Sequence, residues 1–154
     1  MRREKLKVVT PAADAFEHGR YVIDTQVGFL LRIALQRHTA IFTSRMIEGL
    51  TQTQFAALAK LHEVGPCSQN HLGRLICVDA ATIKGVVDRL SARGFLTALH
   101  DMKDRRRRAV DLTDTGRQVI EVAMLVAAEI TTASLAPLSP DEQRLVVRYL
   151  KKLN

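Results

Sequence analysis

Residues 101–116 of this 154-residue chain read DMKDRRRRAVDLTDTG and hold the densest cluster of positive charge in the sequence. The cluster lies between two short segments, 95–99 and 109–112, whose residues suit β-strands and whose ends are rich in turn-forming types. Apart from Met102, the stretch between these segments carries no apolar side chain until the second one begins. This pattern predicts a two-stranded hairpin with a long basic tip.

Two short helices are predicted directly before the hairpin. Ser68 is a suitable N-cap for the first helix, and Asp79 for the second, which runs from Ala80 to about Arg93. Gly94 is the expected C-terminal stop. The inward residues of the second helix recur at helical spacing and are Ile83, Val86, Val87 and Leu90. A helix pair at 68–93 followed by a basic wing at 95–112 predicts a winged helix-turn-helix. In that fold the second helix enters the major groove and the wing reaches an adjacent groove.

Apolar helices are predicted on both sides of this unit. A helical pattern from about 21 to 47 is apolar on more than one face, and Gly49 breaks it. Thr51 and Gln54 then form a capping box for a helix that ends at Gly65-Pro66. We expect residues 1–19 to form a mobile arm or a short helical lead-in.

The helices after the wing are also apolar. Thr113 begins a helix in which residues 119–130, VIEVAMLVAAEI, are almost all apolar, so we expect this run to be buried between other helices. Leu135-Ala136-Pro137 breaks that helix, and Ser139-Pro140 starts the last one. The run is too apolar for one small monomer to hide, which predicts a homodimer.

The expected fold class is therefore mainly α with a small β-hairpin wing (α+β). We expect an N-terminal arm and long dimerisation helix at 1–50, a winged helix-turn-helix DNA-binding domain at 51–112, and C-terminal dimerisation helices at 113–154.

Composition narrows the class of partner. The chain has 23 Lys and Arg against 16 Asp and Glu, a formal charge of +7 that favours an anionic partner. Aromatic residues make up 5% and Trp is absent, which argues against stacking on single strands and favours double-stranded DNA. No apolar run approaches the roughly 20 residues of a membrane helix, and no signal peptide is evident. We therefore expect a cytoplasmic protein without a membrane partner.

Catalytic and metal-binding patterns are not found in the sequence. The histidines lack metal-ligand spacing, neither cysteine lies in a CxxC, and no nucleophile–base spacing or phosphate loop appears. Cys67 and Cys77 are expected to be small buried hydrophobes rather than redox sensors. We expect no cofactor, no metal and no enzymatic activity.

Candidate DNA contacts come from the helix pair and the wing. Lys84 is expected to reach a guanine edge or a phosphate, while small Ala81 and Gly85 permit close approach. Arg89 contacts phosphate or pairs with Asp88 or a wing carboxylate, and the residues do not choose between these. The predicted DNA-binding residues are Ser68, Gln69, Asn70, Ala81, Thr82, Lys84, Gly85, Arg89, Lys103, Arg105 and Arg106.

Structural roles are also expected in the helix pair and the wing. Capping is the simple role of Ser68, and it is compatible with DNA contact. In the wing, Asp104 is expected to pair with an arginine and fix its pose. Arg107 and Arg108 are as readily strand-edge residues as DNA ligands.

Several segments, in the right order and together spanning residues 21–153, resemble the MarR family of bacterial transcription regulators. The family's wing pattern is Asp-x-Arg, five residues, Leu-Thr, two residues, Gly. It is matched by Asp104, Arg106, Leu112, Thr113 and Gly116. Residues 79–94, with Val-Asp-Arg-Leu and a final Arg-Gly, are similar to the family's recognition helix. Departures occur at Met102, where proline is common, and at Ala80, Ala81 and Gly85, where many members carry polar or basic side chains.

The resemblance implies a dimer formed through the terminal helices. It also implies small anionic aromatic compounds that bind between the dimer layer and the winged helix and usually release DNA. We therefore expect a sequence-specific transcription regulator, a repressor released from a palindromic operator by a small aromatic or phenolic acid or its thioester. An architectural DNA-binding protein without an effector is the alternative, and an enzyme is less well supported.

Spacing predicts where such an effector binds. Phe29 and Ile33 are four apart on one helical face, and Arg37 continues that face by another turn. An apolar cavity with one convergent cation suits a small aromatic acid. The predicted effector-binding residues are Phe29, Ile33, Arg37, His38, Arg45 and Phe55. In the alternative interpretation, Arg37 and Arg45 meet acidic groups across the dimer and His38 packs there.

Overall fold

The computed structural model describes residues 16–17, 20–100 and 108–153. Their contacts divide the chain into two units, 1–38 and 39–154. The first unit contains the antiparallel strands β1 (Phe16–Glu17) and β2 (Arg20–Tyr21), and the 3-10 turn η2 (Ile23–Thr25). Helix α1 (Val27–Arg45) begins in this unit and ends in the second.

The start of the first helix differs from the prediction. The sequence pattern placed it near 21, whereas α1 begins at Val27 because Gln26, with φ −83° and ψ 126°, is extended. The arm predicted at 1–19 lies outside the described residues except for β1.

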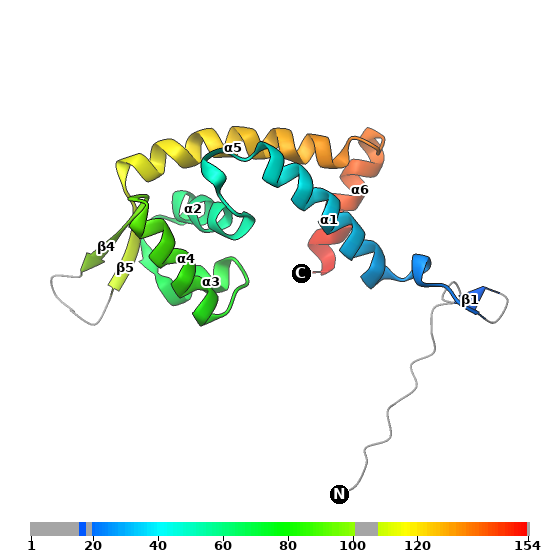
Figure 1. Cartoon of the computed structure of the whole chain (residues 1–154), viewed down its shortest axis with the longest axis horizontal. Coiled ribbons are helices and arrows are strands. Elements are labelled where there is room, and N and C mark those ends of the chain that lie inside the picture. The colour runs from blue at the N-terminus through cyan, green and yellow to red at the C-terminus, as the bar shows by residue number, and fades with distance from the viewer. Residues whose placement is uncertain (1–15, 18–19, 101–107, 154) are drawn as a thin grey trace, which may run out of the picture. The chain divides into compact units, whose positions relative to one another are not determined.

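The second unit contains the predicted helix pair, wing and C-terminal helices. Figure 1 shows α3 and α4 together below α2, with the hairpin β4–β5 beside them. The elements after α1 are η3 (Ile47–Gly49), α2 (Gln52–Val64), β3 (Cys67–Ser68), α3 (Gln69–Leu75), α4 (Ala80–Ala92), β4 (Leu96–His100), β5 (Arg108–Leu112), α5 (Asp114–Leu135) and α6 (Pro140–Leu153).

Local signals account for most of these boundaries. The Thr51 hydroxyl accepts from the Gln54 backbone N–H at 3.2 Å, and the Gln54 side chain accepts from the Thr51 N–H at 3.0 Å, which confirms the capping box. Gly65 after α2 and Gly94 after α4 both have φ 76°, a conformation that glycine adopts without steric cost. The predicted helix ends are confirmed at both positions.

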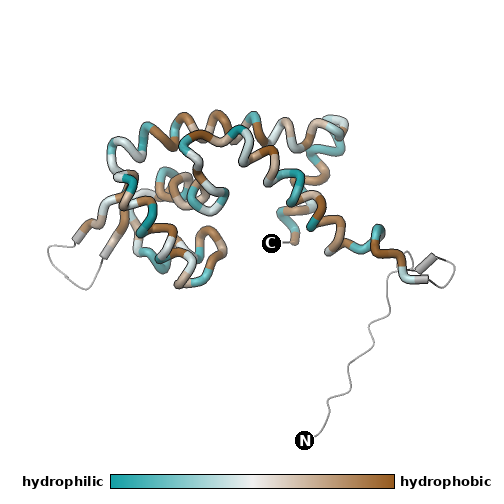
Figure 2. Tube along the Cα trace, viewed as in Figure 1, coloured by the Kyte–Doolittle hydropathy of each residue, from teal (hydrophilic) through white to brown (hydrophobic). Residues whose placement is uncertain are grey.

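The core lies where α2, α3, α4 and α5 meet. Helices α2 and α5 each contribute large apolar side chains to it, and the hydrophobic residues of these helices are brown in Figure 2. Because these residues are removed from water, their burial holds the helix pair in a fixed orientation. The largest fully buried side chains are Leu58, Leu61, Leu72, Ile83, Leu90, Ile120, Ile130 and Val86.

The sheet has one strand more than predicted. Its order is β3-β5-β4, with both pairs antiparallel, so β5 is the central strand rather than one arm of an isolated hairpin. Cys67 is paired with Val110 and Ser68 with Ala109. A two-residue strand is too short for alternation to show in the sequence, which is why it was missed.

Helix α5 is less buried than predicted. Within one chain Ile120, Ala123 and Ile130 are buried, whereas Val122 is 51% and Leu125 is 70% exposed. By length and composition α5 also passes as a membrane span, contrary to the expectation from apolar runs, but a core helix of a soluble protein passes the same test. Ile120, Ala123 and Ile130 place one side of α5 in the core, and its other side is an exposed apolar face.

Candidate nucleic-acid interface

The inner face of α4 determines which of its side chains face outward. Ile83, Val86 and Leu90 are buried against the core, as the sequence spacing predicted. Because side chains repeat every 3.6 residues, the opposite face carries the polar groups. Its exposed residues are Ala81, Thr82, Lys84, Asp88, Arg89 and Ala92, and Gly85 is half-buried among them.

The N-terminus of α4 is capped as predicted. Asp79 Oδ1 accepts from the Thr82 backbone N–H at 2.7 Å. This hydrogen bond lowers the pKa of the Asp79 carboxyl, because it stabilises the charged form. The carboxylate also lies at the positive end of the helix dipole.

A close approach between α3 and α4 fixes the helix-turn-helix. A Cβ added to Gly73 would lie 3.1 Å from Ile83 Cγ2, so the missing side chain is what lets the two helices approach. The Val78 N–H donates to the Gly73 carbonyl at 3.0 Å and closes the turn. Cys77, within this turn, has φ 56° and is exposed, so the prediction that it is buried is wrong. Cys67 is half-buried, and that burial raises the pKa of its thiol.

The start of α3 carries three predicted DNA-binding residues. The Ser68 hydroxyl accepts from the His71 N–H at 3.2 Å, so the capping role of Ser68 is confirmed. Asn70 is exposed and Gln69 is half-buried. Contact of these residues with DNA stays a prediction.

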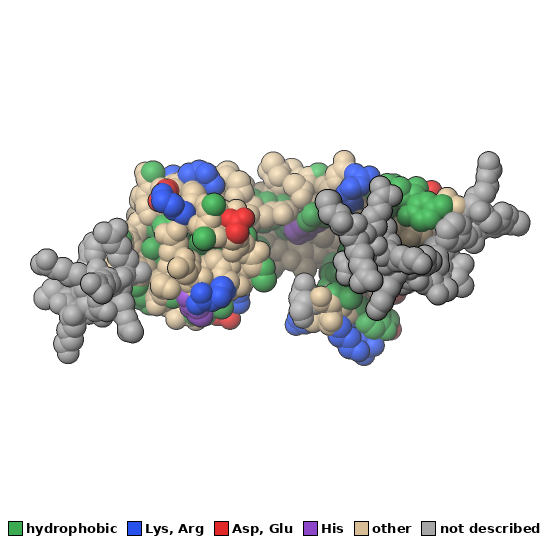
Figure 3. Space-filling model, turned by 90° about the horizontal axis from the view of Figure 1, so that it is seen from below, with side chains coloured by type: hydrophobic (Ala, Val, Ile, Leu, Met, Phe, Trp, Pro, Cys, Tyr) green, Lys and Arg blue, Asp and Glu red, His purple; other side chains and the backbone are tan. Residues whose placement is uncertain are grey.

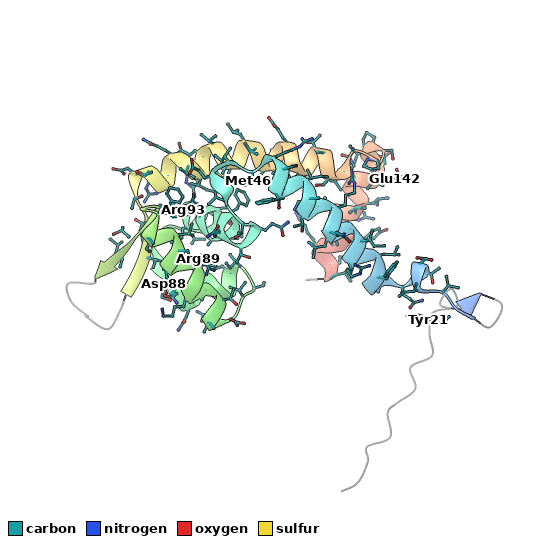
Figure 4. The ribbon with its side chains drawn as sticks, in the orientation of Figure 1. Tyr21, Met46, Asp88, Arg89, Arg93 and Glu142 are labelled. Carbon is teal, nitrogen blue, oxygen red and sulfur yellow. The ribbon has the colours of Figure 1, made fainter. Side chains whose placement is uncertain are left out.

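The outer face of α4 carries an ion pair and a folded-back arginine. Lys84 Nζ lies 2.6 Å from Asp88 Oδ2. The Arg89 guanidinium lies over Gly85, where an added Cβ would be 3.4 Å from Nη1. Asp88 is therefore paired with Lys84. The sequence had left open a pair between Asp88 and Arg89. Figure 4 marks Asp88 and Arg89 on α4, and Figure 3, which views the molecule from below, shows basic and acidic side chains intermixed on this part of the surface.

The structure describes the two strands of the wing, β4 and β5. Strand β4 is paired with β5 from Leu96 opposite Leu112 to His100 opposite Arg108. The tip predicted to contact DNA, with Lys103, Asp104, Arg105, Arg106 and Arg107, lies outside the described residues. Arg108 is the first residue of β5, opposite His100, and whether it contacts DNA stays a prediction.

The Leu-Thr-x-x-Gly pattern at the end of the wing has a steric cause. The Thr113 hydroxyl donates to the Gly94 carbonyl at 2.6 Å and accepts from the Gly116 N–H at 3.0 Å. A Cβ on Gly116 would lie 2.1 Å from the Phe95 carbonyl oxygen, so only glycine fits there. Asp111 also binds Arg117 through both carboxylate oxygens, at 3.1 and 3.2 Å. These contacts attach the wing to α5.

Contacts of Arg93 and Glu48 were not predicted from the sequence. Arg93 Nη2 donates to the Glu48 carbonyl oxygen at 2.7 Å and lies 3.3 Å from Glu48 Oε2. The guanidinium also lies over the Phe95 ring, with Cζ 4.6 Å from the centroid. The two partners are 45 positions apart, so no local signal connects them.

The predicted effector residues fall in both units of the chain. Phe29, Ile33, Arg37 and His38 belong to the 1–38 unit, while Arg45 and Phe55 belong to the 39–154 unit. The ring of Phe55 packs edge-on against Phe42, which the prediction did not include, with centroids 6.0 Å apart. The grouping of these six residues around one ligand stays a prediction.

A pocket of about 360 Å³ lies within the second unit, between the end of α1 and the start of α2. None of the described residues that line it is charged. Its lining residues are Thr39, Phe42, Thr43, Met46, Gly49, Leu50, Thr51, Gln52 and Thr53. Among the described residues, no group of His, Cys, Asp and Glu is arranged to hold a metal ion.

A capped helix pair with an exposed polar outer face, followed by a hairpin wing, defines a winged helix-turn-helix DNA-binding protein. The model of the MarR family matches residues 50–107. Over 148 residues the chain is 37% identical to the HTH-type transcriptional repressor NicR of Pseudomonas putida, covering 96% of this chain and 94% of NicR. The chain therefore belongs to the MarR family, and it is a transcription regulator.

Two solved structures are similar over most of their length. A probable transcriptional regulator from Pseudomonas aeruginosa is 48% identical, with a TM-score of 0.83, over 86% of this chain and 100% of that one. BpsR of Bordetella bronchiseptica, whose DNA binding is regulated by 6-hydroxynicotinic acid, is 40% identical, with a TM-score of 0.82. The match with BpsR covers 88% of this chain and 97% of that one.

Proposed function

We propose that this regulator is a homodimeric cytoplasmic repressor that binds a palindromic operator in double-stranded DNA and is released by a small aromatic acid. The observation that carries the proposal is the exposed polar face of α4, which is held outward by the buried face formed by Ile83, Val86 and Leu90. In the part of the chain that the structure describes, Ala81, Lys84 and Asp88 on this face are exposed, so the face is accessible to the major groove.

Dimerisation supplies the symmetry that a palindrome requires. Val122 and Leu125 on α5, and Leu150 and Leu153 on α6, are large apolar side chains exposed in the single chain. Exposed apolar patches of this kind mark protein interfaces. In the dimer the two copies of α4 would lie roughly 34 Å apart, one turn of DNA.

The proposed effector is a hydroxylated aromatic acid of the size of 6-hydroxynicotinic acid. BpsR, whose DNA binding responds to that compound, supports this choice. The pocket beside Phe42 and Met46 offers apolar walls together with the hydroxyls of Thr39 and Thr43. These groups suit a planar ring that carries a hydroxyl or ring nitrogen. The carboxylate requires a cation, and the candidates predicted from the sequence are Arg37, His38 and Arg45.

Binding to labelled DNA from upstream of the regulator's own gene tests the proposal. Fluorescence anisotropy should show tight binding that 6-hydroxynicotinic acid reverses, while benzene, which lacks both polar groups, leaves the complex intact. Tight binding that neither 6-hydroxynicotinic acid nor a panel of phenolic acids reverses would favour the architectural alternative. If the regulator binds this upstream DNA no more tightly than scrambled DNA, the upstream DNA does not contain the operator.

One variant separates the pocket from the interface interpretation of Arg37. If Arg37 holds the effector, Arg37→Ala should leave dimerisation and DNA binding intact and abolish release. If Arg37 lies in the dimer interface, the same change should lower dimer stability whether or not effector is present. Sedimentation velocity and the anisotropy assay distinguish these outcomes.

A further inference from the structure

The middle of the outer face of α4 carries an acidic side chain. By helical spacing Ala81, Gly85, Asp88 and Ala92 share this strip of the surface, opposite the buried Leu90. Asp88 carries the polar side chain of this strip, because the other three residues are alanine and glycine. A carboxylate that faces DNA is repelled by the phosphates, so its place on this face calls for a specific role.

The carboxylate is held by a lysine. Lys84 Nζ lies 2.6 Å from Asp88 Oδ2, and the two side chains are 68% and 58% exposed. An exposed pair of this kind contributes little to folding stability. Both groups keep further capacity, because an ammonium has three donors and a carboxylate accepts at both oxygens. The pair therefore presents a donor and an acceptor side by side toward solvent.

That arrangement is complementary to one edge of the double helix. In the major groove a G·C pair presents the guanine acceptors N7 and O6 beside the cytosine N4 amino donor. O6 and N4 are hydrogen-bonded to each other at about 2.9 Å, close to the 2.6 Å between Lys84 Nζ and Asp88 Oδ2. The ammonium can donate to guanine while the carboxylate accepts from cytosine. An A·T pair also presents an acceptor, thymine O4, beside the adenine N6 donor, but that donor separates O4 from N7. In guanine the acceptors N7 and O6 are adjacent, so one ammonium can donate to both.

The neighbouring residues suit this contact. An aspartate side chain is short, and bulky neighbours would hold it away from the base edges. Ala81 and Gly85, which lie two turns and one turn before Asp88, add almost no side-chain bulk to the strip. The guanidinium of Arg89 lies over Gly85, to one side of the ion pair, where it is placed to meet a phosphate.

We propose that the Lys84–Asp88 pair reads one G·C base pair in each half of the operator, and that Asp88 is a specificity-determining residue. This proposal rests on the proposed operator binding and is independent of the effector. Lys84 alone would supply affinity for guanine or phosphate. Asp88 makes that affinity conditional on a cytosine amino group at the same position.

Selection of duplexes from a random-sequence DNA pool tests the proposal. The wild-type protein should enrich a palindrome with a G·C pair at one fixed position in each half. For Lys84→Met, replacing that pair by A·T in the enriched duplex should no longer cost affinity. For Asp88→Ala the same replacement should cost clearly less than the roughly tenfold that it costs the wild type. Asp88→Asn should shift the preference toward adenine, since asparagine pairs with its N6 and N7.

A matched ion pair elsewhere serves as the control. Lys60 and Glu63 on α2 are also paired at 2.6 Å and partly exposed. Lys60→Met and Glu63→Ala should leave the enriched motif unchanged, and thermal unfolding of all variants should match that of the wild type.

The outcomes distinguish a failure of the role of Asp88 from a failure of operator binding. A wild-type motif that Asp88→Ala and Asp88→Asn leave unchanged overturns the role of Asp88 and leaves the operator function standing. If the Asp88 variants change the preference at a position where the wild-type motif has an A·T pair, the assignment to G·C is overturned. If the wild type enriches no motif, the operator function itself fails.

Discussion

The guanidinium of Arg93 joins the end of α4 to the turn before α2, because its Nη2 donates to the Glu48 carbonyl oxygen at 2.7 Å. Figure 4 marks Arg93 where α4 ends. Glu48 has φ 56°, and the residues directly after it, Gly49 and Leu50, line the pocket between α1 and α2. The outward-facing helix and the pocket are therefore bonded to each other through one side chain.

Loss of this side chain should destabilise the fold. Arg93→Met removes a charged donor to a backbone carbonyl and should lower the free energy of unfolding by about 1–2 kcal/mol. Glu48→Ala should cost less than about 0.5 kcal/mol, since it removes only the half-exposed carboxylate and keeps the carbonyl. Urea denaturation measures both changes. Equal effects of the two substitutions would show that the backbone hydrogen bond is not the important one.

Gly116 should be the glycine least tolerant of a side chain. A Cβ there would lie 2.1 Å from the Phe95 carbonyl oxygen, so Gly116→Ala forces the wing away from α5 and should cost about 3 kcal/mol. At Gly85 a Cβ meets only the flexible Arg89 guanidinium. Gly85→Ala should therefore stabilise the helix by about 0.5–1 kcal/mol. Thermal unfolding of both variants should shift in opposite directions.

The Asp79 cap should make stability depend on pH. Hydrogen bonding from Thr82 lowers the pKa of the Asp79 carboxyl in the folded protein. The carboxylate therefore stabilises the fold above about pH 4, and this contribution is lost as the pH falls through the lowered pKa. The urea midpoint of the wild type should exceed that of Asp79→Asn at pH 7. A difference that persists unchanged at pH 2.5 would rule out the charge as its source.

The wing arginines should contribute to DNA affinity. We expect Arg106, with Arg105 secondary, to enter the minor groove, where a narrow groove concentrates negative potential. Arg106→Ala should weaken operator binding by about 1–3 kcal/mol and reduce its salt dependence. Titrations between 50 and 200 mM salt, about the range in which such effects are large, measure both. Unchanged affinity across this range would make the wing assignment wrong.

The exposed apolar face of α5 should hold the dimer. Leu125 is 70% exposed in the single chain, and Leu125→Glu would place a charge in the proposed interface. Val64→Glu on α2, at a residue 45% exposed, is the matched control. Sedimentation at micromolar protein should show a dimer for the wild type and the control, and a monomer for Leu125→Glu. A monomeric wild type would overturn the dimer.

Much of the fold was predictable because its signals are local. The caps Thr51, Ser68, Asp79 and Thr113 each act within three residues, so the start of each helix is written beside it in the sequence. Strand β3 was not predictable, since its two residues become a strand only by pairing with β5. The partial exposure of α5 was missed because an apolar run shows that burial is needed, without showing what covers it.

The candidate site also has features that local sequence predicts and features that only the folded chain creates. The outward face of α4 follows from the spacing of Ile83 and Val86. The ion pair between Lys84 and Asp88 was not predicted, although residues four apart on a helix are neighbours, and Arg89 was considered as the partner of Asp88 instead. The bond between Arg93 and Glu48 depends on the folded path of the chain. So does the pocket, which Phe42 and Thr51 reach from different elements.

The inner face of α4 serves folding, and its outer face does not. Exchanging Ile83 or Leu90 would disturb the core, whereas Ala81, Lys84 and Asp88 make no contribution to it. Duplicated genes could therefore diverge in the DNA sequence they recognise through a handful of surface substitutions, with no loss of folding on the way. The same separation makes α4 a suitable place to transplant the outer residues of a related regulator and so redirect this protein to a new promoter.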